Sequence, residues 1–458
     1  CFYYPAVLDL AELPLPPEAQ SALGDSLTAY RSGDLLTALS RYPAARPPAS
    51  EIERVYYAAL LLSVGQVGEA ETALAPFLLA ETTARPAKLA AALRQLIAAV
   101  KRAEHSSQAG SELASELLAA SYYEQSRANA ESSLQTALEL ARQAAAHSPE
   151  FGFAWTRVAE LEFSFGRTRR ALEALNKGLA LAPRNAQALA LKGFLLAAQG
   201  ETRAALSWFD QALAMDAALG NAWLGRGLCR IRRGDTATGR GDLLMAAAME
   251  PQRAALRSYL GKVEADAGDV ARAVKELQLA KQLDPKDPTA WLYSALLNQQ
   301  NNRINDAIRD LEMSQALNDN RSVYRSQLLL DQDRAVRSAS LARIYQEAGM
   351  SEVGLREAAR AVNADYANYA AHLFFADSYQ LDLANQTSQR YETASAVEFL
   401  LANLLSPVGA GTLSPTLSQS EYSRLFERNR PGLVSSTEYL SRGAWTESGA
   451  QYGTFEKF

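Results

Sequence analysis

Residues 155–188 read WTRVAELEFSFGRTRRALEALNKGLALAPRNAQA, and this stretch decides the fold because its pattern returns every 34 residues, five times in all, between Phe151 and Asn318. Four kinds of position recur at that step. Bulky residues stand at Trp155, Leu189, Trp223, Arg257 and Trp291, and turn residues at Gly166, Gly200, Gly234, Gly268 and Asn302. Small residues stand at Ala171, Ala205, Gly239, Ala273 and Ala307, and the unit closes at Pro183, Ala217, Pro251 and Pro285. A fixed period of this length predicts stacked helix–turn–helix units.

Each kind of position has a physical role in a helical hairpin. A residue in the left-handed conformation ends the first helix, and glycine and then asparagine tolerate that conformation best. The small residue lets two helices approach closely, and proline ends the second helix because it has no N–H to donate. The bulky column is predicted to be an apolar plug between neighbouring helices. On that basis Trp223→Ala is expected to cost about 3–5 kcal/mol.

The composition favours a helical protein without a strong charge. The chain has 458 residues, of which 48% are hydrophobic, and its formal net charge of −5 implies no general attraction to nucleic acid. A chain of this length exceeds the usual size of a single core, but stacked repeats need only their neighbours. The longest apolar runs, such as Tyr56–Val64, are far shorter than the roughly 18–20 residues of a membrane-spanning helix. Two cysteines, Cys1 and Cys229, make no disulfide framework.

The 34-residue register divides the chain into segments. The predicted segments are an extended lead-in at 1–17, degenerate hairpins at 18–117, six regular units at 118–321, an interrupted helical stretch at 322–405, a linker at 406–420 and a tail at 421–458. In the irregular units Gly33, Gly65 and Gly349 are predicted turn residues, and Ser132 takes the turn position of the first regular unit.

The register breaks after the last regular unit. The separation of Asn302 from Gly349 is 47 residues, 13 more than one period, so residues 318–334 are predicted to hold an inserted turn or loop. A last helix pair is predicted at 366–405. The aromatic stretch at 451–458 does not have a helical pattern and is predicted to be a strand.

The four columns resemble those of the tetratricopeptide-repeat (TPR) superfamily, over roughly two-thirds of the chain when the degenerate units are counted. The departures are Arg257 for the tryptophan, Gly239 for the alanine and Ala217 for the proline. They loosen single units but not the array. The resemblance implies an all-α fold, a right-handed α-solenoid of tandem TPR helix hairpins, here with a short non-helical C-terminal tail. It also implies a protein or peptide partner on the concave face.

A narrower resemblance concerns four short stretches. Tyr3–Leu13, Leu328–Asp333, Ser338–Tyr345 and Ala371–Tyr379 are similar to parts of a bacterial family that has a FecR-like domain before the repeats and an outer-membrane β-barrel after them. This resemblance implies a periplasmic protein associated with the outer membrane through a C-terminal barrel that the sequence lacks; a cytoplasmic location is the alternative. Cys1 is expected to be the first residue of a fragment, and the alternative is a lipid-bearing residue.

No group of residues in the sequence predicts catalysis. His105, His147 and His372 lie far apart without the spacing of metal ligands. We find neither a phosphate-binding glycine loop nor the strained turn that carries a serine nucleophile. The sequence therefore predicts a protein that is not an enzyme, with no cofactor, no metal and no nucleic-acid partner.

The predicted binding groove follows from the 3.6-residue period of the first helix in each unit. TPR geometry, carried over position by position, puts these residues in the groove: Phe153, Thr156, Glu160, Phe163, Phe194, Leu228, Ile231, Lys262, Leu292, Leu296 and Gln299. The mixture is apolar with a few polar side chains, which suits an extended or helical peptide. The alternative for Phe163, Phe194 and Leu228 is that they belong partly to the core.

The repeats also carry a local excess of positive charge. Residues 151–318 contain 22 Lys and Arg against 18 Asp and Glu, and one unit holds five arginines: Arg226, Arg230, Arg232, Arg233 and Arg240. A solvated helix face is one explanation. The other is a basic patch for an acidic partner, such as an anionic polymer or lipid head groups. A patch of that kind predicts that reversing Arg230 and Arg233 to Glu weakens capture of the partner at low salt.

Taken together, these patterns predict a TPR scaffold that mediates protein–protein interactions on the periplasmic side of a bacterial outer membrane. Two alternatives stay open. The repeats could be the TPR module of an outer-membrane component that exports polysaccharide or protein, or the chain could be a cytosolic assembly adaptor.

Overall fold

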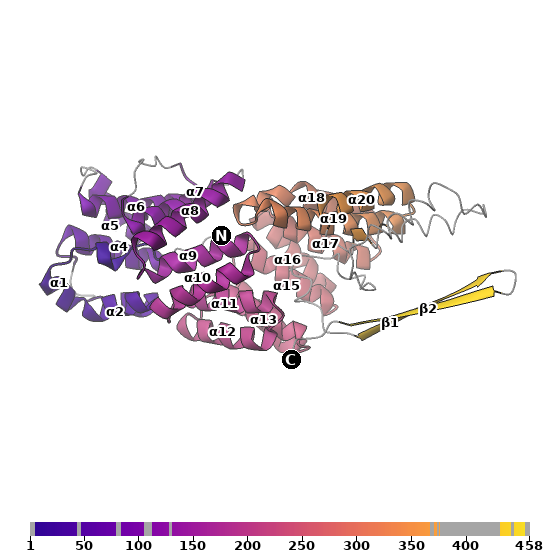
Figure 1. Cartoon of the computed structure of the whole chain (residues 1–458), viewed down its shortest axis with the longest axis horizontal. Helices are drawn as coiled ribbons and strands as arrows, with labels where there is room; N and C mark the ends of the chain where they lie inside the picture. The colour runs from indigo at the N-terminus through magenta and orange to yellow at the C-terminus, as the bar shows by residue number, and fades with distance from the viewer. Residues whose placement is uncertain are drawn as a thin grey trace. The chain divides into compact units, whose positions relative to one another are not determined.

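The computed structural model shows helical hairpins followed by one β-hairpin (Figure 1). It describes residues 5–43, 47–78, 84–104, 112–127, 131–366, 371–372, 375, 431–440 and 444–453. Within these ranges, no helix combines the length and the hydropathy needed to cross a lipid bilayer. The chain divides into two compact units. The first unit is Cys1–Gln199, Ala204–Gly225 and Ser322–Gln327, and the second unit is Gly200–Arg203, Arg226–Arg321 and Leu328–Phe458.

The first unit holds the N-terminal helices. They are η1 (Leu10–Glu12), α1 (Pro17–Ala22), α2 (Gly24–Ser32), α3 (Leu35–Ser40), α4 (Glu51–Ser63), α5 (Val67–Leu74), η2 (Ala75–Leu78), α6 (Arg85–Lys101), α7 (Ala114–Ser126), α8 (Glu131–His147), α9 (Gly152–Ser164), α10 (Thr168–Leu181) and α11 (Ala186–Ala198). Most of α12 (Thr202–Met215) and the first half of α13 (Gly220–Arg232) also belong to it.

The second unit continues the repeats. It holds the rest of α13, then α14 (Thr236–Met249), α15 (Ala254–Asp266), α16 (Val270–Leu283), α17 (Pro288–Gln300), α18 (Ile304–Ala316), the start of η3 (Asn318–Val323), α19 (Gln327–Glu347), α20 (Ser351–Ala364), β1 (Pro431–Leu440) and β2 (Ala444–Gly453). From α14 to α18 each helix packs on the one before it, and α15 also packs on α17. This nearest-neighbour order confirms the predicted all-α solenoid of helix hairpins.

The predicted turn column is confirmed by the backbone. Positive φ angles occur at Gly166, Gly200, Gly234, Gly268 and Asn302, and also at the irregular positions Gly33, Gly65 and Gly349. At Gly200 and Gly268 an added Cβ would meet nothing within 4 Å, so the conformation and not crowding explains the glycine. Ser132 is the exception: it lies inside α8, which begins at Glu131, and is therefore not the turn residue that the register predicts.

The small column is confirmed by packing. Ala171, Ala205, Ala273 and Ala307 are fully buried. At Gly239, where alanine would be expected, a Cβ would lie 2.7 Å from the carbonyl oxygen of Gly227 and 2.6 Å from Ile231. Because those distances are too short for any carbon, the crossing of α13 and α14 requires glycine.

In the bulky column only Leu189 is the buried residue that we predicted. Trp155, Trp223 and Trp291 are only partly buried. Each indole N–H instead donates to the carbonyl oxygen six residues earlier, at distances of 2.9 Å to Pro149, 2.8 Å to Ala217 and 3.3 Å to Pro285. Arg257 makes the equivalent bond, from Nε to the Pro251 oxygen at 3.3 Å. At four of its five positions the column therefore satisfies a carbonyl at the end of the preceding hairpin, a role that arginine can fill as well as tryptophan; Leu189 has no donor and packs instead.

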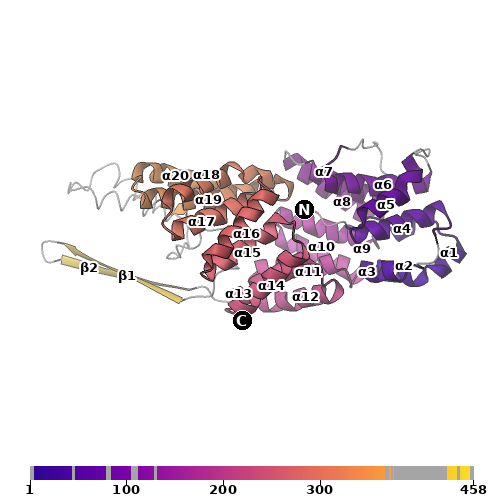
Figure 2. The ribbon, with the colours of Figure 1, turned by 180° about the vertical axis from the view of Figure 1, so that it is seen from behind.

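The first unit closes on itself through contacts between distant parts of the sequence. The Arg184 guanidinium pairs with Asp34 at 2.8 Å, and the Arg184 amide N–H donates to the Ser32 carbonyl at 2.8 Å. The rings of Tyr30 and Phe153 pack with centroids 5.5 Å apart. These contacts bring α2 and its turn beside α9 and the α10–α11 loop, as both views show (Figures 1 and 2).

The N-terminal lead-in (residues 5–16) is an ordered part of that closed unit. Leu8 has none of its surface exposed, and its carbonyl oxygen accepts a hydrogen bond from the Tyr30 hydroxyl at 3.0 Å. The Asp9 N–H donates to the Ser115 hydroxyl at 2.8 Å. The Glu12 carboxylate accepts N–H groups at the start of α7, including that of Ser115 at 3.1 Å. The predicted extended segment thus links α2 to the N-terminus of α7.

The insertion and the tail refine the predictions for the C-terminal part. The inserted residues form η3 and lengthen α19 to 21 residues. By comparison, α15 and α17, which are also the first helices of their hairpins, have 13 residues each. In the tail, β1 and β2 pair antiparallel in the register Pro431↔Gly453 to Leu440↔Ala444. The strand β2 thus begins earlier than the predicted 451–458 and overlaps it at 451–453; residues 454–458 lie outside the described residues. Cys1, the linker at 406–420 and nearly all of the predicted helix pair at 366–405 lie outside the described residues.

Candidate partner-binding site

The predicted groove residue Glu160 belongs to a buried polar cluster in the first unit. Arg157 is 2% exposed and donates from Nε to the Ser121 hydroxyl at 3.1 Å, and from its two Nη atoms to Gln125 at 2.7 Å and Glu160 at 3.2 Å. The guanidinium carbon lies 3.7 Å from the ring centre of Tyr122. Burial raises the pKa of Glu160, while the Arg157 charge beside it acts in the opposite direction. The Glu160 carboxylate is therefore paired with Arg157, while 30% of its side chain stays exposed.

The other predicted groove residues of the first unit also make internal contacts. Phe153 and Thr156 are buried, with Phe153 against Tyr30 and the Thr156 hydroxyl donating to a carbonyl of its own helix. Phe163 and Phe194 are half-buried. Phe153 and Thr156 are therefore not accessible to a partner, whereas Phe163 and Phe194 keep part of their surface exposed.

In the second unit, burial separates the predicted groove residues into two sets. Leu228, Ile231, Leu292 and Leu296 are buried. Lys262 and Gln299 keep part of their surface accessible. Lys262 pairs with Asp266 at 2.6 Å, and Gln299 donates to Glu347 at 2.7 Å.

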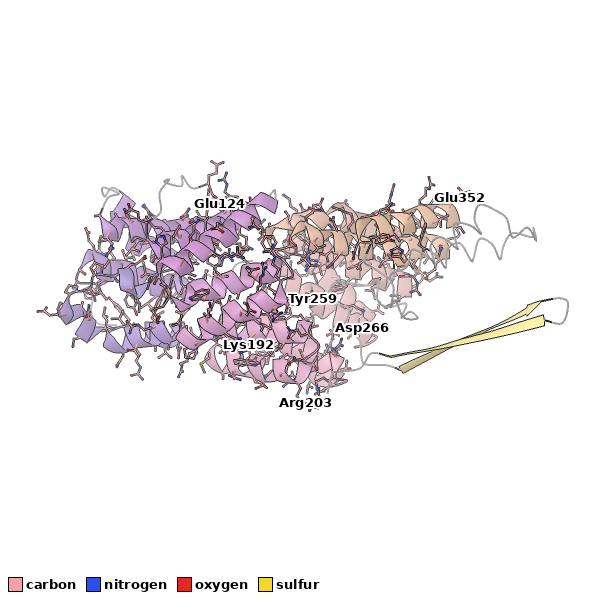
Figure 3. All side chains as sticks on the ribbon, viewed as in Figure 1. Glu124, Lys192, Arg203, Tyr259, Asp266 and Glu352 are labelled. Carbon is pink, nitrogen blue, oxygen red and sulfur yellow. The ribbon has the colours of Figure 1, made fainter. Side chains whose placement is uncertain are left out.

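The accessible set extends across successive first helices. Glu347 at the end of α19 also pairs with Arg343 at 3.2 Å, and Asp266 ends α15 (labelled in Figure 3). We call Lys262, Asp266, Gln299, Arg343 and Glu347 the inner row. The sequence predicted Lys262 and Gln299; Arg343 and Glu347 were missed because they follow the insertion, which breaks the 34-residue register.

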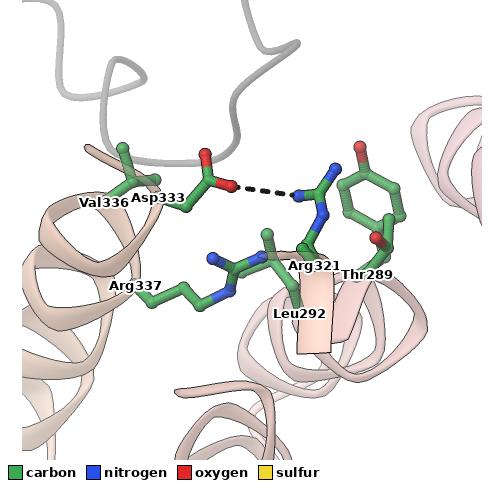
Figure 4. A pocket seen from close by; sticks show the side chains of 7 residues that line it. Thr289, Leu292, Arg321, Asp333, Val336 and Arg337 are labelled. Atoms are coloured by element: carbon green, nitrogen blue, oxygen red, sulfur yellow. Dashed lines mark hydrogen bonds and ion pairs between the residues drawn. The ribbon is translucent and has the colours of Figure 1, made fainter. Parts of the chain in front are cut away.

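Next to the inner helices lies a small pocket that the insertion creates (Figure 4). It is lined by Thr289, Leu292, Tyr293, Arg321, Asp333, Val336 and Arg337. Arg321 pairs with Asp333 at 3.3 Å, and Arg337 donates from Nε to the Ser314 hydroxyl at 3.1 Å. The volume is about 10 Å³, which is the space of one water molecule. The pocket is thus a polar packing feature and not a substrate cavity.

The five arginines predicted as a basic patch are differently placed. Arg226 and Arg230 both pair with the buried carboxylate of Asp242, at 2.8 and 2.7 Å. Arg240 pairs with the buried Glu264. Arg232 is half-buried and Arg233 is exposed. Three of the five positive charges are therefore opposed by interior carboxylates, which reduces the charge available to an outside anion.

Among the residues that the structure describes, no three or more His, Cys, Asp or Glu side chains gather as metal ligands would.

Sequence comparison identifies no relative: no protein-family model and no curated protein matches the chain. Solved structures do resemble it. Cut9, in the crystal structure of the APC/C hetero-tetramer Cut9–Hcn1, aligns over 88% of this chain and 81% of its own, with a TM-score of 0.52 and 15% identity. Yeast Tom70 aligns over 86% and 90% (TM-score 0.44, 13% identity), and a tetratricopeptide repeat protein from Parabacteroides merdae over 58% and 98% (TM-score 0.43, 16% identity). The chain has the tetratricopeptide-repeat fold, as its sequence columns predicted.

Proposed function

We propose that this protein is a non-enzymatic scaffold that binds a protein or peptide partner through the inner row of the second unit. The observation that carries the proposal is that row itself. Gln299 and Glu347 are accessible polar side chains on α17 and α19, and Lys262 of α15, with 11% of its side chain exposed, continues the row on the preceding first helix. A partner lying across them would meet the Lys262–Asp266 pair, the Gln299 amide and the Arg343–Glu347 pair in order, and exposed pairs of this kind are weak enough to be exchanged for a partner's charges.

The apolar part of the inner face supports this role indirectly. Leu292 and Leu296 are buried against the chain's own helices, so they hold α17 in place and do not project into solvent. The Gln299–Glu347 bond joins two hairpins across the insertion. A rigid backbone of this kind presents its polar groups without an ordering cost on binding. Cut9, which shares the fold, was crystallised in a hetero-tetramer with Hcn1, and that is consistent with a binding role for this fold.

The test replaces Gln299 with a photo-crosslinking amino acid and irradiates the cells that produce this variant. In the control variant, Arg169 is replaced with the same amino acid. Arg169 lies on α10 with its side chain 93% exposed, so it reports random encounters. We expect defined protein adducts from position 299 that are missing from position 169. For the partner so identified, exchanging the charges in Lys262→Glu/Glu347→Lys should weaken binding about tenfold. Identical adducts from both positions would contradict the proposal.

We also propose that the scaffold acts on the periplasmic side of an outer membrane. The support is the resemblance of the stretches at Tyr3–Leu13, Leu328–Asp333 and Ala371–Tyr379 to the bacterial family described above. The alternatives are an export component and a cytosolic adaptor. Fractionation of the native cells distinguishes the three: recovery with outer membranes supports the first two, and recovery with cytosol supports the adaptor. Loss of polymer or protein export on deletion of the gene would then identify the export component.

A further inference from the structure

The lead-in (residues 5–16) contacts the rest of the first unit in the way that a bound peptide contacts its receptor. Its backbone is extended on both sides of the single turn of η1. The side chains of Val7 and Leu8 are 1% and 0% exposed, and the Leu8 carbonyl oxygen accepts a hydrogen bond from the Tyr30 hydroxyl of α2 at 3.0 Å. Pro14 is exposed, so one edge of the segment faces solvent.

A second helix, distant in sequence from α2, holds the polar groups of the same segment. The Asp9 N–H donates to the Ser115 hydroxyl at 2.8 Å, and the Glu12 carboxylate accepts the N–H groups of Ala114 and Ser115 in the first turn of α7. A carboxylate is favoured there because the N-terminus of a helix carries a partial positive charge. We call Tyr30, Ala114 and Ser115 the seat. Apolar anchors together with one acidic anchor are the features by which proteins recognise extended peptides.

The lead-in does not satisfy every group that it buries. Asp9 is 6% exposed, and its Oδ1 accepts the N–H of Ala11, whereas its Oδ2 has no hydrogen-bond partner among the described residues. Burial, and the Asp9 charge beside it, raise the pKa of Glu12. A buried carboxylate without a cation costs more free energy than a neutral amide of the same shape. A segment with an uncharged polar residue in the place of Asp9 should therefore fit the seat better.

We infer that the seat is a peptide-binding site, filled in this structure by the chain's own lead-in and open to a segment of a partner protein with matching chemistry. That segment has two consecutive apolar residues, then an uncharged polar residue, and a glutamate three positions after that. The lead-in acts as an autoinhibitory strap, because a tethered segment has an effective concentration of roughly millimolar and excludes weak ligands. The seat lies in the first unit and the inner row in the second, so the inference does not depend on the proposed function.

The test uses two full-length variants that place arginine at neighbouring positions of the lead-in. Glu12→Arg puts a positive charge at the N-terminus of α7 and should release the lead-in. Ala11→Arg is the matched control, because Ala11 is exposed. A fluorescent peptide of residues 5–16 should bind Glu12→Arg at least about tenfold more tightly than Ala11→Arg, in which the seat stays filled. Bound peptide should also raise the melting temperature of Glu12→Arg, since it stabilises the folded state.

Variants of the peptide test which groups the seat recognises. The Leu8→Asp and Glu12→Gln peptides should each bind Glu12→Arg at least about tenfold more weakly, whereas the Ala11→Gln peptide should keep the affinity. The Asp9→Asn peptide should bind about threefold more tightly or better, because it buries no unpaired charge. In excess, it should also displace the lead-in of the unaltered chain, which mass spectrometry would detect as faster hydrogen exchange in the chain's own residues 6–13.

Several results would overturn the inference. Equal affinity of Glu12→Arg and Ala11→Arg for the peptide, or equal affinity for the native and Leu8→Asp peptides, would show that binding does not occur at the seat. Unchanged exchange of the lead-in in the presence of the Asp9→Asn peptide would exclude displacement, and this measurement on the unaltered chain stands even where Glu12→Arg unfolds. Dimers in sedimentation that Glu12→Arg abolishes would assign the seat to an exchange of lead-ins between two copies of the chain.

Discussion

The two units of this protein are built from the same helical hairpin but are held together differently. In the first unit, residues about 150 positions apart in the sequence meet at Asp34 and Arg184, and an N-terminal segment is packed into the structure. In the second unit, helices α14 to α18 contact mainly their neighbours in sequence. The comparison indicates that the same hairpin can be held in place either by contacts between distant parts of the sequence or by its sequence neighbours alone. The first unit should also unfold as one piece, whereas the second should fray hairpin by hairpin.

The largest effect is expected from Arg157→Ala in the first unit. Removing the guanidinium takes away the ion pair of Glu160 and the donor that the buried Gln125 oxygen accepts from, and leaves a large buried space, which should lower the free energy of unfolding by about 3–5 kcal/mol. Urea unfolding followed by circular dichroism measures it. Arg169→Ala, at a side chain 93% exposed, is the control and should change stability by no more than about 0.5 kcal/mol.

Leu8→Ala should cost about 2–4 kcal/mol, because the removed side chain is wholly buried. The same variant also tests whether the first unit unfolds as one piece while the second unfolds hairpin by hairpin. Hydrogen exchange should become faster throughout the first unit, including α2 and α7, while α15 to α18 keep their protection. The matched variant is Leu277→Ala in α16, another buried leucine, for which we expect faster exchange only in adjacent helices. Loss of protection confined to the lead-in after Leu8→Ala would show that closure is not cooperative.

Trp223→Ala should cost about 2 kcal/mol, less than the sequence indicated, because the ring is only partly buried and its main polar contact is the bond to the Ala217 carbonyl. The sharper test is Trp291→Arg, which copies the residue found at Arg257. If the column serves chiefly to satisfy a carbonyl, thermal melting of Trp291→Arg should lie much closer to wild type than that of Trp291→Ala. Equal melting of the two variants would argue for ring packing instead.

The smallest effect is expected at the turns. Gly268→Ala should cost about 1 kcal/mol, since φ is +82° and no neighbour crowds the new methyl group. Gly65→Ala in the first unit, with φ of +87° and equal space, should cost the same, because the penalty is local to the backbone. Denaturant titration of both variants checks this, and a much larger cost at Gly65 would mean that closure strains that turn.

The structural features that recur in each hairpin could be predicted from the sequence. The turn residues Gly33, Gly65 and Gly349 could be placed because positive φ admits few residue types. The partial burial of Trp223 could not be predicted, because a large aromatic residue in a repeat fits either a plug or a carbonyl donor. The contacts of Arg184 with Asp34 and Ser32 could not be predicted either, since they depend on how several irregular hairpins change the direction of the chain. The inner row was half predicted: Lys262 and Gln299 follow the period, whereas Arg343 and Glu347 come after an insertion that removes it.

The bond between the Arg184 amide and the Ser32 carbonyl has a consequence for how such a gene can lengthen. Duplicating one 34-residue module among α14 to α18 would add a hairpin between two like surfaces, and every existing contact would find its counterpart. The same duplication between α4 and α9 would push Arg184 away from Ser32 and separate Phe153 from Tyr30. The second unit can therefore gain hairpins by duplication. In the first unit, the contacts between its distant segments fix the number of hairpins.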